Sequence, residues 1–288
     1  KAEAVYQHML QYNPKYRDLK QKLDRSRAMA ETVMFGNTAH SAGGSILNNG
    51  SVEKPMLGRY QVEKELGKGA MGVVYQGKDP KIGRIVAIKT MALAEEFSGG
   101  ELEEARTRFF REAETAGRLN HPNIVTIYDA GEEHDLAYIA MEFLRGNDLA
   151  GYIKPGVLLP IDEVLRIGEQ IASALHYAHQ QSVVHRDIKP ANIMYEASSK
   201  TVKVTDFGIA RITDSSRTKT GMVLGTPSYM SPEQLSGKRV DGRSDLFSLC
   251  VMMYQMISGQ LPFQGESMAE LMYCIANAQH MNIKEHMP

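Results

Sequence analysis

The sequence predicts an α+β fold, in which a small antiparallel sheet lobe with one helix precedes a larger, mainly helical lobe. Between residues 60 and 141, short apolar runs rich in valine, isoleucine and tyrosine recur between glycine-containing and polar turns, a pattern typical of antiparallel strands. A charged segment at 101–119 interrupts these runs and carries apolar residues at helical spacing. That spacing returns at 161–181, and the segment 245–257 is apolar almost throughout, as expected of a central helix.

Composition limits the classes of function. The chain has 288 residues, of which 43% are hydrophobic, enough to form the core of one large or two modest domains. A formal net charge of -1 gives no reason to expect a nucleic-acid partner. Cys250 and Cys274 lie in apolar helical segments, so we expect buried free thiols in a reducing compartment.

No apolar run reaches the roughly 18 residues of a membrane span, and we expect a cytoplasmic chain. The first residue is Lys1 rather than Met, so we interpret the sequence as a piece of a longer protein. The cytoplasmic part of a larger, membrane-linked protein is the open alternative.

Residues 1–35 predict a helical hairpin, because apolar residues share one helix face before Pro14 and another face after it. Ala2, Tyr6 and Pro14 fall at the spacing of the second half of a tetratricopeptide repeat. The segment therefore resembles the last helix of such an array with its capping helix, and would bind protein partners. An isolated amphipathic hairpin is the alternative.

The remaining sequence divides into a linker and one main domain. Residues 36–56 are rich in glycine, asparagine and serine, a composition that predicts a flexible linker. We place the main domain at 57–288, with the sheet lobe at about 57–144 and the helical lobe at about 145–288.

A glycine-rich turn joins the first two predicted strands. Gly67, Gly69 and Gly72 lie between Leu66 and the β-branched and aromatic run at 73–75. A dinucleotide-binding fold would place a helix after such glycines, whereas residues 73–75 favour a strand. We expect a hairpin whose backbone can approach phosphates closely, with an ordinary hairpin as the alternative.

Lys89 ends the next predicted strand, and Glu112 lies within the predicted helix at 101–119. Apolar residues at helical spacing around Glu112, such as Phe109 and Ala113, form the inner side of that helix. A glutamate beside an inward-facing stripe needs a cationic partner, and Lys89 is the candidate. The alternative is that both side chains are solvated.

The segment 185–208 carries the densest group of polar residues that could bind a ligand or take part in catalysis. Asp187, Asn192 and Asp206 are separated by two short strand-like runs, and a hairpin of these runs would bring the three side chains to the same end. Converging carboxylate and amide oxygens can hold a hard divalent cation such as Mg²⁺.

Together these pieces resemble a protein kinase, and most closely the bacterial kinases of the eukaryotic Ser/Thr type. The resemblance covers the chain from about residue 58 to 280 and implies the two-lobed kinase fold. The matching residues are Gly67 to Gly72, Ala87-Ile88-Lys89, Glu112, His185-Arg186-Asp187, Lys189, Asn192, Asp206-Phe207-Gly208, Ser231-Pro232-Glu233 and Asp245.

The resemblance implies a catalytic role for five residues. Lys89 would hold the α- and β-phosphates of ATP and pair with Glu112. Asp187 would orient the attacking hydroxyl and accept its proton, and Lys189 would neutralise the transferred phosphoryl group. Thr226 would lie near Asp187 in the platform for polypeptide substrates.

The resemblance also implies a nucleotide site. Asn192 and Asp206 would hold Mg²⁺ or Mn²⁺, and ATP would be the phosphoryl donor. Met141 would be the gatekeeper, and the backbone of Glu142 and Leu144 would meet the adenine. For the apolar members of the set, ordinary core packing is an alternative that is compatible with this role. The implied ATP-binding residues are Leu66, Gly67, Lys68, Gly69, Ala70, Met71, Gly72, Val74, Ala87, Lys89, Met141, Glu142, Leu144 and Met194.

Regulation by phosphorylation is implied as well. An arginine before the catalytic aspartate, here Arg186, usually meets a phosphate on the activation loop. Thr218 and Thr220 stand eight and six residues before Thr226, where related bacterial kinases autophosphorylate. We expect autophosphorylation at both threonines, which requires self-association of the chain.

The expected function is therefore phosphoryl transfer from ATP to serine and threonine hydroxyls of proteins. A pseudokinase or scaffold of the same fold is one alternative, and a small-molecule kinase of related fold is another, although the platform at 225–233 argues against the latter. The family normally continues with further helices, one of which supplies an arginine to Glu233. From the sequence we expect the helical lobe to lack these helices and Glu233 to lack that partner.

Overall fold

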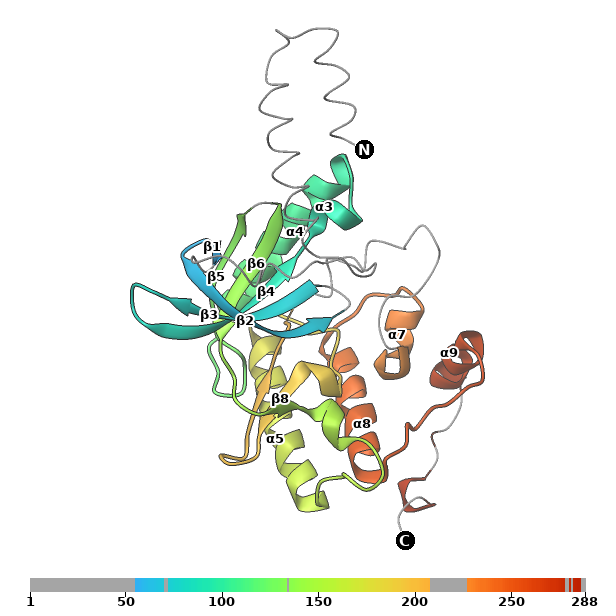
Figure 1. Ribbon diagram of the computed structural model, residues 1–288. Coiled ribbons are helices and arrows are strands. Elements are labelled where there is room, and N and C mark those ends of the chain that lie inside the picture. Colours follow the sequence, from blue (N-terminus) through green and yellow to red (C-terminus); the bar gives the residue numbers. More distant parts are fainter. Residues whose placement is uncertain are drawn as a thin grey trace, which may run out of the picture. The chain divides into compact units, whose positions relative to one another are not determined.

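A computed structural model provides the structure of the protein (Figure 1). It describes residues 55–69, 72–133, 135–207, 227–277, 280 and 282–285. Across these ranges, no helix combines the length and the apolar character needed to cross a membrane. The predictions that fall outside these ranges concern the hairpin at 1–35, most of the linker, Ala70, Met71, Thr218, Thr220 and Thr226.

The first lobe is a six-stranded sheet with two helices. The strand order is β1-β2-β3-β4-β6-β5, and all neighbours run antiparallel. The elements of this lobe are β1 (Met56–Leu57), β2 (Tyr60–Gly69), β3 (Gly72–Asp79), β4 (Arg84–Met91), α3 (Leu93–Glu96), α4 (Gly100–Gly117), β5 (Ile127–Glu133) and β6 (Leu136–Glu142). The predicted sheet lobe is therefore confirmed, with a short helix before the expected one.

The glycine-rich segment forms the tip of the β2–β3 hairpin, as the β-branched residues after it predicted. Gly69 pairs with Gly72 across the two strands. Gly72 has a φ of 139°, and a Cβ atom there would lie 1.8 Å from the carbonyl oxygen of Thr90. Only glycine fits this position, because any side chain would collide with the backbone of β4.

The apolar run at 124–128 is one of the strand-like runs predicted between residues 60 and 141, but its strand begins only near the end of the run. β5 starts at Ile127, whereas Ile124 forms a parallel bridge with Val204 and the amide of Val125 donates to the carbonyl oxygen of Val204 at 3.0 Å. The apolar run is thus shared between two sheets, because its first residues pair with the second lobe. Periodicity alone could not reveal this division.

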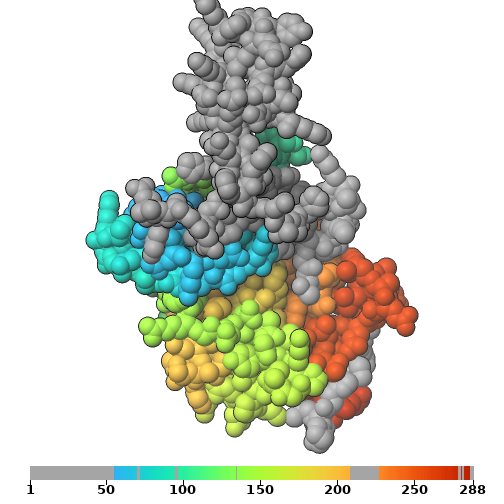
Figure 2. Space-filling view, in the orientation of Figure 1, coloured from blue at the N-terminus to red at the C-terminus, as the bar shows by residue number. Residues whose placement is uncertain are grey.

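The second lobe is mainly helical and contains a small three-stranded sheet of order β7-β8-β9. Figure 2 shows its described residues, coloured yellow-green to red, directly against the blue and cyan strands of the first lobe. Its elements are β7 (Asn147–Asp148), η1 (Leu149–Tyr152), α5 (Ile161–Gln180), η2 (Pro190–Asn192), β8 (Ile193–Glu196), β9 (Thr201–Val204), η3 (Pro227–Tyr229), α7 (Pro232–Leu235), α8 (Gly242–Ser258), α9 (Met268–Asn277) and η4 (Ile283–Glu285).

The core of the second lobe lies between α5 and α8 (Figure 1). The inner face of α5 includes Ile167, Ile171 and Leu175, which are fully buried. Ile161 and Leu165, which also fall at helical spacing, are 43% and 52% exposed. The helical spacing is confirmed, but spacing alone does not show which apolar stripe of α5 is buried.

The two cysteines are free thiols, as predicted, but they are not buried. Cys250 is exposed and Cys274 is intermediate. Cys250 lies on α8 between the buried residues Leu249 and Val251. An apolar run in a helix does not show which residue faces outward, and here the outward position falls on the cysteine.

Candidate active site

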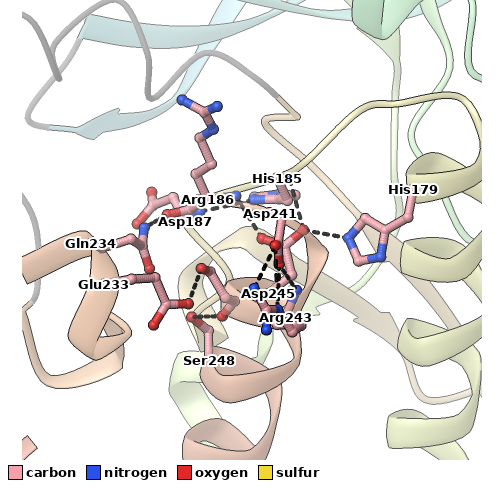
Figure 3. Close-up of polar contacts among 11 residues, drawn as sticks. His179, His185, Arg186, Asp187, Glu233, Gln234, Asp241, Arg243, Asp245 and Ser248 are labelled. Atoms are coloured by element: carbon pink, nitrogen blue, oxygen red, sulfur yellow. Dashed lines mark hydrogen bonds and ion pairs between the residues drawn. The ribbon is translucent and has the colours of Figure 1, made fainter. Parts of the chain in front are cut away.

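A buried aspartate on α8 holds the segment that follows α5. Asp245 is fully buried and accepts hydrogen bonds from the backbone amides of His185, at 2.9 Å, and Arg186, at 2.7 Å. The Nε2 atom of His179 lies 2.7 Å from the same carboxylate (Figure 3). Arg186 has a φ of 71°, a conformation that non-glycine residues adopt only when their surroundings hold it. Asp245 therefore fixes the backbone beside Asp187.

His185 connects this loop to β9. Its Nδ1 atom accepts from the amide of Asp187 at 3.2 Å, so Nε2 carries the proton and donates to the carbonyl oxygen of Thr205 at 2.8 Å. The imidazole is buried, and its centroid lies 4.6 Å from that of the Phe207 ring. One ring thus links the segment of Asp187 to the segment of Asp206.

Asp187, Lys189 and Asn192 form a hydrogen-bonded group in the loop that precedes β8. Lys189 Nζ donates to Oδ2 of Asp187 at 2.7 Å. The amide nitrogen of Asn192 donates to the carbonyl oxygen and to Oδ2 of Asp187, at 2.7 and 2.9 Å. The Asp187 side chain stays 30% exposed, so its carboxylate can still meet a substrate hydroxyl.

Asp206 lies beyond β9 and reaches the first lobe. Its Oδ2 atom forms an ion pair with Lys89 Nζ at 2.8 Å. Burial raises the pKa of Asp206, but the charge and hydrogen bond of Lys89, with smaller effects from His185 and Lys189, lower it more. The net shift of the pKa is downward, so the carboxylate is ionised at neutral pH.

The predicted ion pair between Lys89 and Glu112 is not formed. Both residues lie in the described ranges, where Lys89 pairs with Asp206 and Glu112 lies 3.7 Å from Arg111 Nη2. Glu112 is only 6% exposed on the inner side of α4, which confirms that it faces inward. Sequence spacing did not indicate that Lys89 would pair with Asp206.

The residues present fit a hard divalent cation. The amide nitrogen of Asn192 donates to Asp187, which leaves its amide oxygen as the ligand atom, and Asp206 supplies an ionised carboxylate. Across the described residues, no group of three His, Cys, Asp or Glu side chains is arranged as a metal site. A cation held by Asn192 and Asp206 would therefore complete its shell with phosphates and water, as Mg²⁺ commonly does.

The residues expected to bind adenine differ in exposure, and some are buried while others face solvent. Ala87 pairs with Met141 across β4 and β6, and both are buried. Leu66 is 43% exposed. Residues 142–145 lead from the end of β6 to the second lobe and are called the hinge. They border a hollow of about 320 Å³. Its lining residues are Glu142, Phe143, Leu144, Arg145, Met194, Glu196, Thr201 and Lys203.

Several residues around the site were missed by the sequence interpretation. Lys203, the polar residue in the alternating run at 202–204, had no expected role, and its Nζ atom donates to Oε2 of Glu142 at 2.7 Å. Gln234 donates to the carbonyl oxygen of Arg186 at 2.7 Å and thereby ties α7 to the loop of Asp187 (Figure 3). The alternating pattern was the available signal for Lys203, whereas no local pattern indicates His179 or Gln234.

Glu233, which was expected to lack the family's arginine partner, has a hydrogen-bond donor within the described residues. The hydroxyl of Ser244 donates to Oε1 of Glu233. Burial raises the pKa of Glu233, but hydrogen bonds from Ser244 and Ser231 and the charge of Arg243 lower it more. The carboxylate is therefore stabilised in its ionised form by the start of α8.

Comparisons with known proteins agree with the geometry. A family model described as "Protein kinase domain" matches residues 60–287. The chain is 44% identical over 217 residues to the serine/threonine-protein kinase PrkC of Bacillus subtilis, covering 75% of this chain and 33% of that protein. It is 42% identical over 227 residues to the serine/threonine-protein kinase pkn3 of Myxococcus xanthus, covering 75% and 40%.

Solved structures give the same result. The crystal structure of a point mutant of the Mycobacterium tuberculosis PknI kinase domain matches with a TM-score of 0.64 and 30% identity. The match covers 83% of this chain and 85% of that one. The chain spans a third or somewhat more of the length of the curated relatives named above.

Proposed function

Because the chain belongs to the protein kinase family, we propose that it transfers the γ-phosphoryl group of ATP to serine and threonine hydroxyls of proteins. The observation that carries this proposal is the group of Asp187, Lys189 and Asn192, held by hydrogen bonds next to Asp206. Lysine two residues after the aspartate is the Ser/Thr-type form of this loop. The relatives named as serine/threonine-protein kinases support the same substrate class.

The geometry assigns a task to each residue. Asp187 is exposed enough to accept a hydrogen bond from a substrate hydroxyl and then its proton. Lys189, 2.7 Å from Asp187, would place its positive charge beside the transferred phosphoryl group. Asn192 and Asp206 would hold Mg²⁺, which supplies neutralisation of phosphate charge when it is bound. Lys89 would exchange part of its contact with Asp206 for the phosphates of ATP.

A transfer assay tests the proposal. The chain is incubated with labelled ATP, Mg²⁺ and a generic basic protein, and the label in that protein is measured. We expect the Asp187→Asn variant to lower turnover by about 10²–10⁴-fold, the usual range for loss of a general base. Glu169→Gln, an exposed carboxylate on α5, is the matched control and should retain turnover. Label transfer that is equal in wild type and Asp187→Asn would refute the proposal, and binding of ATP without transfer would support a scaffold.

We further propose that the kinase is regulated by autophosphorylation at Thr218 and Thr220. What supports this is the position of Arg186, whose backbone is fixed by Asp245 while its side chain extends away from that carboxylate (Figure 3). A guanidinium in this position can bind a phosphate in bidentate fashion. Peptide mass spectrometry after incubation with ATP and Mg²⁺ should find phosphate within residues 213–222. Phosphate found only elsewhere would contradict the proposal.

Residues 1–35 are proposed to bind protein partners or a second copy of the chain, on the strength of the repeat-like spacing in the sequence alone. Deletion of residues 1–54 should then change the oligomeric state or the captured partners, measured by light scattering and affinity capture. An unchanged mass and partner set would remove this role. The free state of Cys250 and Cys274 supports a reducing, cytoplasmic location, which fractionation of cells would test.

A further inference from the structure

Lys203 and Glu142 form an ion pair at the hinge between the two lobes. The distance from Nζ to Oε2 is 2.7 Å, and the side chains are 19% and 27% exposed. Glu142 is the last residue of β6 and follows Met141, while Lys203 lies in β9, three residues before Asp206. The pair therefore joins the segment expected to meet adenine to the strand that leads to the expected metal carboxylate.

The same two side chains also bind a third segment. Lys203 Nζ donates to the carbonyl oxygen of Ile124 at 3.4 Å, and the amide of Thr126 donates to Oε2 of Glu142 at 3.4 Å. The backbone amide of Glu142 donates in turn to the carbonyl oxygen of Thr126 at 2.9 Å. Three chain segments, namely residues 124–126, the end of β6 and β9, thus meet at one charged pair.

The register of the β8–β9 hairpin places Lys203 on the wall of the hinge hollow. Lys203 pairs with Met194, and Glu196 pairs with Thr201. Opposite residues of an antiparallel pair point to the same face, as do residues two apart. These four side chains share one face, and all four line the hollow of about 320 Å³ together with residues 142–145.

We propose that Lys203 is a positioning residue for the nucleotide, which acts through Glu142. The pair sets the separation between the hinge backbone and Asp206, the two points that must grip opposite ends of ATP. This inference rests on the proposed function. A ligand that touches both points depends on their separation, whereas a ligand that touches only the hinge does not, because misplacement matters only where two contacts must be satisfied together.

Loss of Lys203 should weaken the binding of ATP more than the binding of adenosine. In Lys203→Met, affinity for ATP with Mg²⁺ should fall by roughly 3–10-fold, the range of a partly buried ion pair of about 1 kcal/mol. Affinity for adenosine should change by less than about 2-fold on the same reasoning. KM for ATP should rise in parallel, while kcat stays within about 2-fold, because Lys203 makes no contact with the reacting atoms.

The experiment measures both dissociation constants by calorimetry and both kinetic constants by transfer assay. Lys203→Arg and the exchange Glu142→Lys with Lys203→Glu should recover most of the affinity for ATP. Lys200→Met, at the exposed tip of the same hairpin and paired with Glu163, is the matched control and should bind both ligands as wild type does.

Three results would overturn the inference: equal losses for ATP and adenosine, no loss in Lys203→Met, or a loss that Lys203→Arg does not recover. A wild-type chain that binds both ligands and transfers nothing would overturn the proposed function but leave the binding comparison standing. A wild-type chain that binds neither ligand would overturn both.

Discussion

The two halves of the candidate site are held by different kinds of contact. On the side of the catalytic loop, one fully buried carboxylate, Asp245, accepts two backbone amides. On the nucleotide side, the contacts are ion pairs that involve a flexible lysine, such as Lys89 with Asp206, and both side chains remain partly exposed. Backbone amides cannot change position without moving the chain, whereas a lysine can exchange one anion for another.

This difference indicates which part of the candidate site has a fixed geometry before any ligand binds. The loop of Asp187 has its geometry set by buried hydrogen bonds to a charged group, each worth about 1.5–3 kcal/mol. The ion pairs of the nucleotide side are worth less, about 0.2–1 kcal/mol where water reaches them. We infer that the base is preorganised and that the phosphate-binding lysine adapts to its ligand.

Removal of the Asp245 charge should have the largest effect on the catalytic-loop side. In Asp245→Asn, one backbone donor would face an amide NH₂ group instead of an oxygen, inside a buried site. We expect a loss of unfolding free energy of about 2–5 kcal/mol, together with a loss of transfer activity as the loop of Asp187 shifts. Urea denaturation gives the first quantity and the transfer assay gives the second.

The control for this prediction is Asp162→Asn, an exposed carboxylate in the first turn of α5. Its effect on stability should stay within about 0.5 kcal/mol. A urea midpoint for Asp245→Asn that matches the control would show that the buried carboxylate does not hold the loop.

Lys89→Met tests the adaptable half. Transfer should fall by about 10²–10³-fold, as for loss of one preorganised charge at a reacting group, while the stability loss should be smaller than that of Asp245→Asn. The stabilisation that Lys89 gives Asp206 depends on pH with a defined sign. Since the folded-state pKa of Asp206 is lowered below its usual 3.8, this contribution is present above that value and is lost as the pH falls through the lowered pKa.

The matched control is Lys81→Met, an exposed lysine in the turn between β3 and β4. The stability difference between wild type and Lys89→Met should shrink in urea titrations below pH 4, and that between wild type and the control should not. A difference that persists unchanged at pH 2 would assign the stabilisation to packing of the lysine stem rather than to its charge.

The features that the sequence predicted correctly are local ones. Alternation of apolar and polar residues at 202–204 indicated a strand, which β9 confirms, and β9 pairs with β8 in the short hairpin that was expected. The β-branched residues after the glycines predicted a strand and not a helix, and β3 confirms it. In each case the elements that meet are neighbours along the chain, so pattern and spacing suffice.

The features that the sequence could not supply depend on distant partners. Asp245 reaches a loop about 60 residues away, and nothing near it in sequence marks His179 as its neighbour. Glu112 was the expected partner of Lys89, whereas the observed contact with Asp206 depends on how the lobes are arranged. Which apolar stripe of α5 becomes buried likewise depends on where α8 packs against it.

Ser244→Ala tests the hydrogen bond between α8 and Glu233 at the edge of the catalytic-loop side. Glu233 would lose a hydroxyl donor from a buried position, at a cost of about 1–3 kcal/mol in unfolding free energy. Because the folded-state pKa of Glu233 is lowered, this cost should be present at neutral pH and diminish as the pH falls through that pKa. Ser236→Ala, an exposed serine that bonds the carbonyl oxygen of Pro232, is the control, and an equal cost in both variants would contradict the prediction.

The smallest change in stability is expected at His121, in the loop between α4 and β5. His121 follows α4, its Nδ1 atom accepts from the amide of Asn123 at 3.1 Å, and its ring lies against that of Tyr177 on α5, with centroids 5.4 Å apart. Protonation would turn Nδ1 into a donor and break the bond to Asn123. Burial lowers the pKa of His121 below its usual 6.5, with a further contribution from Lys203.

The sign follows from this lowered pKa. Above pH 6.5 the imidazole is neutral in both folded and unfolded chains, and its contribution to stability is complete. As the pH falls from 6.5 toward the folded-state pKa, the unfolded chain binds the proton first, so stability declines. The difference in unfolding free energy between pH 7.5 and pH 5.5 should therefore be smaller in His121→Gln than in wild type, by at most about 1 kcal/mol. The control is His176→Gln, which replaces an exposed histidine on α5, and it should reproduce the wild-type difference. A His121→Gln chain that also reproduces this difference would show that the loop does not respond to pH.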